Sequence, residues 1–600
     1  MDLEKKKKKP VIFFIMLALI GIFFFLVLEL NKNMIAGWVI TAGLLIGFAI
    51  WRNRSLLYKK RWKSFLAWLG FLASLFFVVW ATQGPYKLRP AVDGGNGGKT
   101  GIISTAQGDL TGVYTRDKKV EVYAGIPYAK PPIGDLRWKE PQDPDKWSGV
   151  LTADHFGPMS MQPSKSNIID SLTRIIGYHD YNISLEDNFR DIMSEDSLYL
   201  NVWKPAGDIS KAPVLVYIHG GGLETGQPWY EDYKGESLAR EGVVVVNMAY
   251  RLGVFGYYAD EELRLESANN TTGNYGMLDQ IKALEWVKKN ISTFGGDPDN
   301  ITISGESAGS AAVSALCTSP LAKGLFNRAI GESSSVTAAQ PAHSFRSFED
   351  AIKDGKETRE KLAGLGENTA SINDLRKISA HDLVEMTKLN HHMTVDGYAL
   401  TETPYESYKK GVHNEEALLE GYNARESEAF TIMHEADLKN YHDRLSDMFG
   451  EYTDEILKLY PASTNEEAKK NFRELFTVYY FSYGHYIWSK QGAANNEKVY
   501  EYYFTKENGR LGSWHSGEEV YFYKNIPENS KLYNESDYKL KEIMSSYFKN
   551  FIFTGDPNGD GLPVWKESVD GADLMEFGDK VGMTKDKYIK VYEILEKLNR

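Results

Sequence analysis

The pentapeptide Gly305-Glu306-Ser307-Ala308-Gly309 holds the side chain in this sequence that is best placed to act as a nucleophile. Its pattern, Gly-x-Ser-x-Gly, puts a serine on a strained turn between a strand and a helix, where the hydroxyl is exposed. The residues just before it, Ile-Thr-Ile at 301–303, predict a short buried strand. The pattern therefore favours a serine hydrolase, although a glycine-rich turn without chemistry would show the same five residues.

A second glycine-rich segment, His219-Gly220-Gly221-Gly222, follows a strand that we predict at 213–218. In lipases and esterases such a loop turns its backbone N–H groups toward the oxyanion that develops during ester cleavage. We expect the N–H groups of Gly221, Gly222 and Ala308 to form this oxyanion hole.

The elements around these two segments follow a regular order. Another strand is predicted at 243–248, and a helix follows it with apolar residues at 278, 281, 284, 287 and 291 on one face. Strand, helix and strand at this spacing form a βαβ unit with parallel pairing. Ser307 would then lie at the carboxyl end of a parallel strand, with the His219 loop two strands earlier, a context that favours chemistry over a chance match.

The first 90 residues differ in composition from the rest of the chain. They carry 14 Lys and Arg against 3 Asp and Glu, whereas the remaining residues hold 55 basic and 78 acidic side chains. The strongly acidic main part argues against nucleic acid as a partner. Three apolar runs, 11–30, 34–51 and 65–81, fill the basic segment.

Each apolar run approaches or reaches the ~17–25 residues that a helix needs to cross a bilayer. A cleaved signal peptide would have a shorter first run, followed by a cleavage site of small residues. Buried core helices would show a polar face, which these runs lack. We therefore predict a membrane anchor over residues 1–82 with three spans, and the lipid bilayer as its partner.

The basic residues also predict the orientation of the anchor. Lys5 to Lys9 precede the first run, and the loop after it holds only Lys32. Basic ends stay in the cytoplasm, so the amino terminus would be inside and everything after the third run outside, on a flexible linker at 83–100 that includes Gly94 to Gly98. The third run is the shortest, with 17 residues. The same orientation puts the loop between the second and third runs in the cytoplasm, and this loop is also basic: it holds Arg52, Arg54, Lys59, Lys60, Arg61 and Lys63.

Cys317 is the one cysteine in the sequence, so no intrachain disulfide can form. An outward-facing domain of this size in an animal normally uses several disulfides, so their absence fits a bacterial cell membrane better. The apolar neighbours of Cys317 at 311–316 predict a buried thiol rather than a nucleophile.

Further segments occur in an order that is typical of one enzyme family. They are Gly125-Ile-Pro-Tyr-Ala-Lys-Pro-Pro132, Glu195-Asp-Ser-Leu-Tyr-Leu-Asn-Val202, Tyr250-Arg-Leu-Gly-Val-Phe-Gly256, Asn274-Tyr-Gly-Met-Leu-Asp-Gln280, Phe294-Gly-Gly-Asp-Pro298 and Phe553-Thr-Gly-Asp-Pro-Asn558. Together with the pentapeptide, they resemble the type-B carboxylesterases, the family of bacterial para-nitrobenzyl esterases, liver carboxylesterases and cholinesterases. The resemblance covers most of residues 100–570.

The resemblance implies an α/β-hydrolase fold for residues 101–600, with a central, mostly parallel sheet and helical insertions, preceded by the three transmembrane helices. It also implies a carboxylesterase that acts on small-molecule esters without a cofactor, and we find no metal-ligand spacing in the sequence. One departure concerns a disulfide of the family, whose two positions are Ser160 and Ser197 here. A second is Leu223, where the family usually has an aromatic residue after the glycine loop.

The catalytic histidine of α/β-hydrolases follows the serine and the acid along the chain, in a loop after a late strand. A strand is predicted at 499–504, and Gly512-Ser-Trp-His515-Ser-Gly-Glu518 after it resembles the family's Gly-x-x-His-x-x-Glu. The resemblance therefore makes His515 the base. No strand precedes His434, His442 or His485, which we expect to be surface or core histidines.

The triad acid should lie between these two residues. The segment Gly421-Tyr-Asn-Ala-Arg-Glu426 follows a strand end and resembles the family's Gly-x-Asn-x-Asp-Glu-Gly, which makes Glu426 the acid. Ser427 takes the place of the last glycine, and Glu428 is the alternative acid.

The assembled triad would work as an acyl-transfer catalyst. His515 would take the proton of Ser307 as it attacks the ester, Glu426 would orient the imidazole, and water would then hydrolyse the acyl-enzyme. Glu306 would line the site and orient water, as the same carboxylate does in the family, unless it is simply a solvated turn residue. The alternative function is a catalytically silent adhesion or binding protein, which would be expected to have lost the nucleophile.

Overall fold

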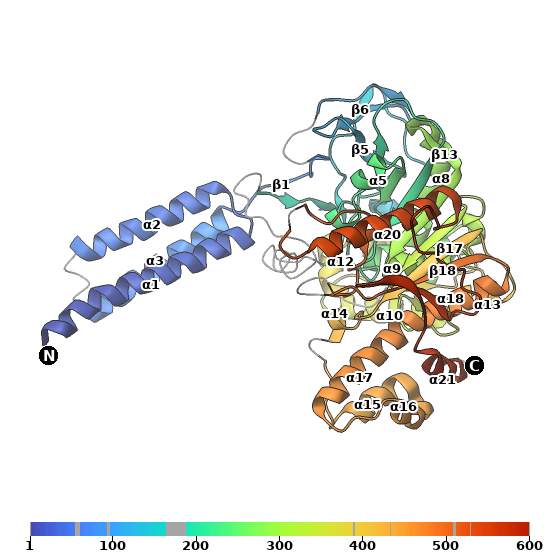
Figure 1. The fold of residues 1–600 in the computed structure, drawn as a ribbon. Helices are drawn as coiled ribbons and strands as arrows, with labels where there is room; N and C mark the ends of the chain where they lie inside the picture. Colours follow the sequence, from blue (N-terminus) through green and yellow to red (C-terminus); the bar gives the residue numbers. More distant parts are fainter. Residues whose placement is uncertain are drawn as a thin grey trace. The chain divides into compact units, whose positions relative to one another are not determined.

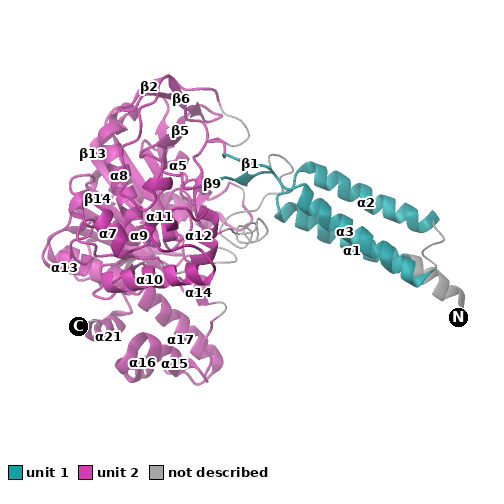
Figure 2. Ribbon diagram, turned by 180° about the vertical axis from the view of Figure 1, so that it is seen from behind, with its two compact units in different colours: residues 1–88, 164–192 teal, residues 89–163, 193–600 magenta. Residues whose placement is uncertain are grey.

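The computed structural model describes residues 2–54, 60–92, 97–163, 188–387, 391–431, 434–507, 512–528 and 530–598 (Figure 1). These residues form two compact units, one of residues 1–88 with 164–192 and the other of residues 89–163 with 193–600 (Figure 2). Most of the predicted glycine tip at 94–98 lies outside the described residues, as do Lys59 and most of the loop between Ser160 and Ser197.

The first unit contains three long helices, α1 (Asp2–Leu30), α2 (Ile35–Arg54) and α3 (Arg61–Ala81). In the described part of the chain, these three are long and apolar enough to cross a membrane. All three differ from the predicted runs: α1 begins nine residues before 11, α2 begins one residue later and ends three later, and α3 begins four residues earlier than 65. The helices continue into flanking polar residues because Arg and Lys have good helix propensity and can keep their charged ends in water.

A polar cluster joins the ends of the three helices. The side-chain amide of Asn33, which is fully buried, donates to the carbonyl of Val79 at 2.7 Å and to the hydroxyl of Thr82 at 2.8 Å. Farther along the bundle, the rings of Phe48 and Phe71 stack with their centroids 4.2 Å apart.

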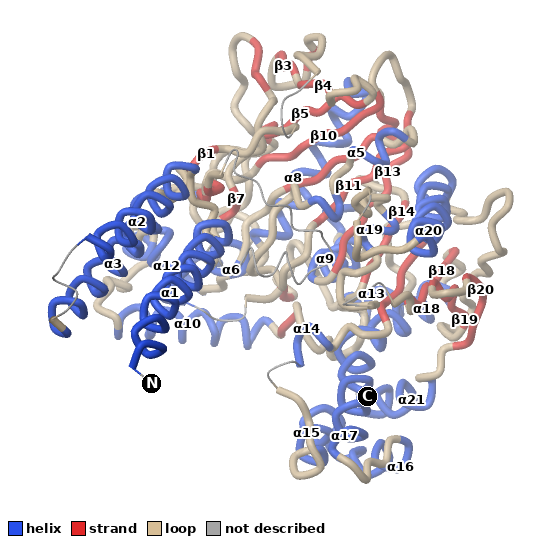
Figure 3. Tube along the Cα trace, turned by 60° about the vertical axis from the view of Figure 1, so that its left-hand side comes forward, coloured by secondary structure: helices blue, strands red, loops and turns tan. Residues whose placement is uncertain are grey.

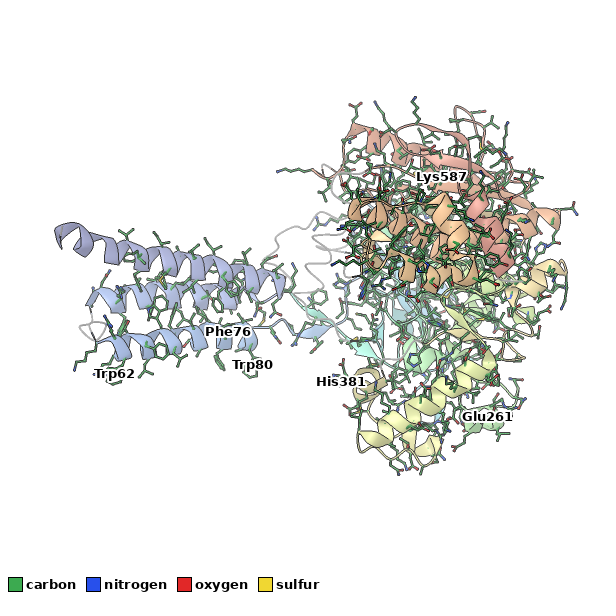
Figure 4. The ribbon with its side chains drawn as sticks, turned by 90° about the horizontal axis from the view of Figure 1, so that it is seen from below. Trp62, Phe76, Trp80, Glu261, His381 and Lys587 are labelled. Atoms are coloured by element: carbon green, nitrogen blue, oxygen red, sulfur yellow. The ribbon has the colours of Figure 1, made fainter. Side chains whose placement is uncertain are left out.

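The outer side of α3 is rich in large apolar residues. Trp62, Phe76 and Trp80 lie along it and are 61%, 60% and 69% exposed (Figure 4). A bilayer would cover such a surface, since exposed apolar side chains of this size are costly in water.

The segment after α3 is more ordered than the flexible linker expected at 83–100. Within the first unit, β1 (Tyr86–Lys87) pairs in parallel with β8 (Arg190–Asp191), and the Arg190 guanidinium donates to the carbonyl of Gly84 at 2.9 Å. In the second unit, Ala91 is buried and its N–H donates to the carbonyl of Asp154 at 2.9 Å. These backbone groups find partners in segments that lie far away in the sequence, which composition alone does not reveal.

The second unit is built around a large sheet. In the described residues it has 11 strands in the order β20-β19-β18-β17-β14-β13-β11-β12-β10-β5-β4. The strands between β12 and β19 pair in parallel, whereas those at both edges pair antiparallel. Figure 3 shows them in red, running side by side. Their bounds are β4 (Val113–Tyr114), β5 (Val120–Pro127), β10 (Tyr199–Pro205), β11 (Ala212–Ile218), β12 (Val244–Met248), β13 (Gly296–Glu306), β14 (Arg328–Glu332), β17 (Ala417–Asn423), β18 (Lys498–Phe504), β19 (Asp573–Phe577) and β20 (Val581–Lys585).

Alternate residues of the central strands supply two hydrophobic cores, one on each face of the sheet. On β11, Val214 and Val216 pack with residues of α8 (Tyr275–Asn290) and α9 (Ala308–Leu316). Leu215 and Tyr217 face the other way, into a core with α5 (Glu236–Arg240), α19 (Glu519–Phe522) and α20 (Glu535–Thr554). Burial on both faces is typical of parallel strands and explains their nearly continuous apolar sequences.

Helical insertions form a third core. Aromatic and leucine side chains pack there between α15 (Tyr441–Phe449), α16 (Thr453–Leu459), α17 (Asn465–Thr477), α18 (Tyr483–Ala494) and α21 (Ile589–Leu598). In the described residues, the remaining α-helices are α6 (Gly253–Tyr257), α7 (Glu261–Glu266), α10 (Phe348–Gly364), α11 (Ile372–Leu375), α12 (Ala380–Thr387), α13 (Pro404–Lys409) and α14 (Glu428–Thr431). Short strands pair outside the main sheet: β2 (Ile103–Ser104) and β6 (Val150–Thr152) with β3 (Asp109–Thr111), β7 (Met159–Ser160) with β9 (Met193–Ser194), and β15 (Phe345–Arg346) with β16 (Met393–Thr394).

The parallel strands place the predicted site residues at one edge of the sheet. The loop from Gly220 to Gly222 follows β11, Ser307 follows β13, Glu426 follows β17, and the loop with His515 follows β18. Carboxyl ends of neighbouring parallel strands meet at the same edge, which is where α/β sheets bind their ligands.

Candidate active site

Ser307 lies on a sharp turn between β13 and α9. Its backbone has φ 55° and ψ −127°, a conformation that costs a non-glycine residue roughly 1–3 kcal/mol and persists where the surrounding structure enforces it. The Ser307 N–H donates to the carbonyl of Glu332 at 2.8 Å. A Cβ on Gly309 would lie 2.0 Å from the carbonyl oxygen of Ile218, and one on Gly305 would lie 2.5 Å from the carbonyl carbon of Gly309. Both glycines of the pentapeptide are therefore required by close packing.

The glycine loop after β11 lies directly against this turn. A Cβ on Gly220 would be 3.0 Å from the Cβ of Ser307. Gly221 and Gly222 have φ values of 105° and 68° and are exposed. The carbonyl of Gly221 accepts from the N–H of Thr225 at 3.0 Å, which fixes the loop.

The three N–H groups expected in the oxyanion hole are available to a ligand. Among the described residues, no protein group accepts a hydrogen bond from the N–H of Gly221, Gly222 or Ala308. Ala308 is the first residue of α9, so its N–H also belongs to the positive end of the helix dipole.

Glu426 and His515 are brought together although they lie far apart in the sequence. The Nδ1 atom of His515 is 2.6 Å from Oε2 of Glu426, and the other oxygen of Glu426 accepts from the N–H of Asn423 at 2.7 Å. Glu426 is completely buried. A buried carboxylate in this position holds the imidazole with Nδ1 protonated, so Nε2 is the nitrogen that can act as a base when the ring is neutral.

The two loops that carry this pair are joined through their backbones. The N–H of Arg425 donates to the carbonyl of Ser513 at 3.0 Å, and the side-chain amide of Asn423 donates to the carbonyl of Trp514 at 2.7 Å. The loops follow the adjacent parallel strands β17 and β18, in which Asn423 is opposite Phe504. The sheet register therefore determines which acid and which histidine meet.

The Nε2 atom of His515 faces Glu306 rather than the nucleophile. It lies 3.2 Å from Oε1 of Glu306, which also accepts from the hydroxyl of Ser516 at 2.6 Å. Both Ser307 and His515 are described, and no hydrogen bond joins their side chains. Catalytic hydrogen bonds are often long or poorly aligned before substrate binds. The structure thus brings the acid and the base together and puts Glu306, the neighbour of the nucleophile, against the base.

Two carboxylates control the protonation of His515. Burial lowers the pKa of the imidazole, but Glu306 and Glu426 outweigh this effect and raise the pKa to about 9. Burial also raises the pKa of Glu306 to about 6, although the His515 imidazolium opposes the change. The resting site therefore favours an imidazolium between two carboxylates at neutral pH.

Glu518, a further buried carboxyl, lies in the same loop as His515 and fixes it by hydrogen bonds. Glu518 accepts from the hydroxyl of Ser333 at 2.8 Å and from that of Tyr502 at 3.1 Å. Burial, together with the negative charges of Glu426 and Glu306, raises its pKa to about 8.

Two phenylalanines that the sequence analysis did not assign to the site contact the histidine. The ring centroids of Phe430 and Phe481 lie 5.1 Å and 5.0 Å from that of His515. Phe481 lies in the π-helical segment Val478–Ser482, within an aromatic run whose side chains are compatible with core packing as well. No motif marks either residue, so their contact with the site depends on tertiary structure.

The other candidate residues lie elsewhere. Glu428 forms ion pairs with Arg425 at 2.9 Å and Arg473 at 3.4 Å. His485 is buried against Glu420, whereas His434 and His442 are exposed. The thiol of Cys317 is buried.

Ser160 and Ser197, the two positions of the missing disulfide, lie next to each other. The hydroxyl of Ser160 donates to that of Ser197 at 3.1 Å, and both residues are buried. A pair of serines thus occupies the place of the bridge.

Comparison with known proteins gives consistent matches over the second unit. The model of the carboxylesterase family matches residues 99–590. Fumonisin B1 esterase of Sphingopyxis macrogoltabida is 31% identical over 549 residues, which cover 87% of this chain and 92% of that protein. Carboxylesterase 1C of Rattus norvegicus is 31% identical, over 77% of this chain and 87% of its own length.

Solved structures show the same likeness. The crystal structure of the Geobacillus stearothermophilus carboxylesterase EST55 superposes with a TM-score of 0.69 at 31% identity and covers 82% of this chain and 99% of its own. PNB esterase superposes with a TM-score of 0.68 at 27% identity, with the same coverage. These likenesses, together with the topology of the sheet, identify the second unit as an α/β-hydrolase fold.

Proposed function

This chain belongs to the carboxylesterase family and is a carboxylic ester hydrolase, and we propose that it cleaves its esters through a covalent acyl-enzyme on Ser307. The observation that carries the proposal is the strained backbone of Ser307, with φ 55°, at the carboxyl end of β13. Strain of this kind is kept at functional sites, where it exposes a nucleophile. The relatives are named esterases, which favours an enzyme over a catalytically silent binding protein.

The proposed reaction begins with proton transfer from Ser307 to His515. For this step His515 must be neutral, and its Nε2 must exchange its contact with Glu306 for the Ser307 hydroxyl. Glu426, hydrogen-bonded to Nδ1, keeps the ring oriented and stabilises the imidazolium that forms. The serine oxygen then attacks the ester carbonyl, and the imidazolium returns its proton to the leaving alcohol.

The oxyanion of the tetrahedral intermediate would be bound by the N–H groups of Gly221, Gly222 and Ala308. Such a donor typically contributes about 3–4 kcal/mol to transition-state stabilisation. Deacylation repeats the steps with water, which His515 activates and Glu306 helps to orient.

We assign the first unit to membrane anchoring, with the three helices α1–α3 as spans. The basic residues in the first turns of α1, Lys5 to Lys9, and those around the connection from α2 to α3 favour an amino terminus in the cytoplasm. The esterase unit would then face the outside of the cell. A bacterial cell fits this arrangement, because an exported domain with one cysteine has no disulfide.

Hydrolysis of short-chain aryl esters by the purified full chain tests the proposed nucleophile. Ser307→Ala should lower kcat by roughly 10⁴–10⁶-fold, since the nucleophile and base act as a unit. Its unfolding temperature should stay near that of the parent, because alanine fits the same turn. Ser546→Ala on α20, where the serine is partly buried and lies outside the candidate site, serves as the control and should retain activity. Full activity of Ser307→Ala would refute the acyl-enzyme on this residue.

A further inference from the structure

A second cluster of ionisable side chains lies at the amino ends of β17 and β18, the opposite ends from those that lead to Glu426 and His515. His413 and Glu415 belong to the loop before β17, and Glu497 directly precedes β18. The two strands pair in parallel with Ala417 opposite Lys498. This register puts the residues just before the strands side by side.

The three side chains converge on one point. Nδ1 of His413 lies 3.7 Å from Oε1 of Glu415 and 4.0 Å from Oε2 of Glu497. One nitrogen and two carboxylate oxygens all lie within 4.8 Å of one another. A four-coordinate cation with bonds of about 2.0–2.2 Å holds its ligand atoms roughly 3.3–3.6 Å apart, so small side-chain shifts would bring these three ligands to the ion, and a water molecule would be the fourth.

Among the described residues, no group forms a hydrogen bond with the carboxylate of Glu497. Its side chain is completely buried, and neither of its oxygens takes part in a hydrogen bond. The carboxylate is held close to α18, since a Cβ on Gly492 would lie 2.7 Å from Oε2. In the part of the chain that the structure describes, no lysine or arginine pairs with Glu497 or Glu415. A buried carboxylate without a counter-charge is strongly destabilising, and a bound cation would supply the missing counter-charge of Glu497.

Glu415 is also buried, but it is fixed in place by its neighbours. It accepts from the hydroxyl of Tyr408 and from the N–H of Asn414, the latter at 3.2 Å. The ring of Tyr408 stacks on that of His413 with centroids 5.5 Å apart.

We propose that His413, Glu415 and Glu497 form a structural binding site for one divalent transition-metal ion of the zinc type. An imidazole and two carboxylates are a ligand set that suits Zn²⁺, whereas Mg²⁺ and Ca²⁺ prefer oxygen ligands alone. Nδ1 of His413 also faces the carbonyl of Glu415 at 3.1 Å, a hydrogen bond that the metal would replace. The His413 side chain is 14% exposed and gives the ion a path from solvent.

Such an ion would link the starts of two strands whose far ends carry the acid and the base. The ion takes no part in the proposed reaction, so the proposal of a metal site does not depend on the proposal of an acyl-enzyme on Ser307. The sequence shows no metal-ligand spacing because the third ligand comes from a different strand.

Zinc binding to the full chain, purified in detergent and freed of metal with a chelator, tests the site. Elemental analysis after dialysis against Zn²⁺ should give one ion per chain, and the unfolding temperature should rise with Zn²⁺. Glu497→Gln and His413→Gln should each weaken Zn²⁺ binding about tenfold or more. Without metal, Glu497→Gln should unfold no lower than the parent, because the substitution removes an uncompensated buried charge.

Two variants control for zinc bound elsewhere. His381→Gln removes an exposed histidine that lies 3.7 Å from Asp382, and His515→Gln removes the active-site imidazole. Both should keep the binding of one ion with parental affinity. Parental zinc affinity in both Glu497→Gln and His413→Gln, equally tight binding of Mg²⁺, or a parent that binds no zinc would each overturn the proposal.

Discussion

At the residue scale, the contact between His515 and Glu426 determines which carboxylate serves the base. Glu426 lies 2.6 Å from the imidazole, whereas Glu428 is engaged by Arg425 and Arg473. Glu426→Gln should lower kcat/KM by roughly 10⁴-fold, because the amide holds the histidine in the wrong tautomer. Glu428→Gln is the matched control and should stay near the parent. The assignment fails if the two variants lose activity in the opposite order.

Glu306 should shift the pH dependence of the esterase. Its carboxylate lies 3.2 Å from Nε2 of His515 and favours the imidazolium, which cannot act as a base. Since the pKa of His515 is raised to about 9, kcat/KM should rise with pH through this range. Glu306→Gln removes a negative charge, lowers the pKa of His515 and should move the acid limb about 1–2 pH units lower. An unchanged acid limb, measured with the same aryl ester, would show that this contact does not control the base.

The place of a residue in the candidate site was predictable where a backbone pattern or a family motif accompanies it. The glycines around Ser307 lie where only glycine fits, and the resemblance of segments 421–426 and 512–518 to family motifs marks Glu426 and His515. Phe430 and Phe481 carry no such mark, because a ring beside the base has the same local sequence as a ring in the core. The contact between Glu306 and His515 likewise depends on how two loops meet.

At the element scale, the strands were predicted more reliably than the connections between them. The strand predicted at 213–218 corresponds to β11, and the one at 499–504 to β18, because continuous apolar runs identify strands buried on both faces. The antiparallel edges and the pairing of β1 with β8 could not be predicted, since partners of short polar strands come from distant segments.

The contact between Ser160 and Ser197 suggests that a disulfide at these two positions could stabilise the segment between them. Their hydroxyls lie 3.1 Å apart, so Ser160→Cys combined with Ser197→Cys should form a disulfide under oxidising conditions. Closing a loop of this length stabilises by about 4 kcal/mol when the bridge is unstrained. The double variant should therefore unfold at a higher temperature than the parent, and reductant should remove the gain. The Ser160→Cys variant alone is the control; failure of the double variant to form the bridge would show that the two backbones are too far apart.

At the scale of the whole molecule, the chain combines an esterase unit with a unit of three apolar helices, for which we propose membrane anchoring. Three helices long enough to span are present in the described residues, and α3 contains 21 residues rather than the 17 of its apolar run. The four added residues at 61–64 include Arg61 and Lys63, so the apolar run itself stays 17 residues long. Length and polarity suffice to predict three helices that could span, whereas the orientation depends on the basic residues at the helix ends.

Protease added to intact protoplasts tests the orientation. If the amino terminus is in the cytoplasm and α3 crosses, the segment between α3 and residue 100 is outside, and cleavage there should release soluble esterase activity. Activity in the supernatant of an untreated sample is the control for lysis. Protection of the esterase until the protoplasts are lysed would mean that the second unit faces the cytoplasm.

The central claim, an acyl-enzyme on Ser307, is tested most directly by mass spectrometry of the covalent intermediate. An aryl carbamate is suitable, since the carbamoyl group that it transfers is hydrolysed slowly. After incubation and acid quench, the intact protein should gain the mass of one carbamoyl group, and peptide mapping should place it on Ser307. Ser307→Ala should gain none. A carbamoyl group on a different residue, or ester turnover by Ser307→Ala at the parental rate, would contradict the account.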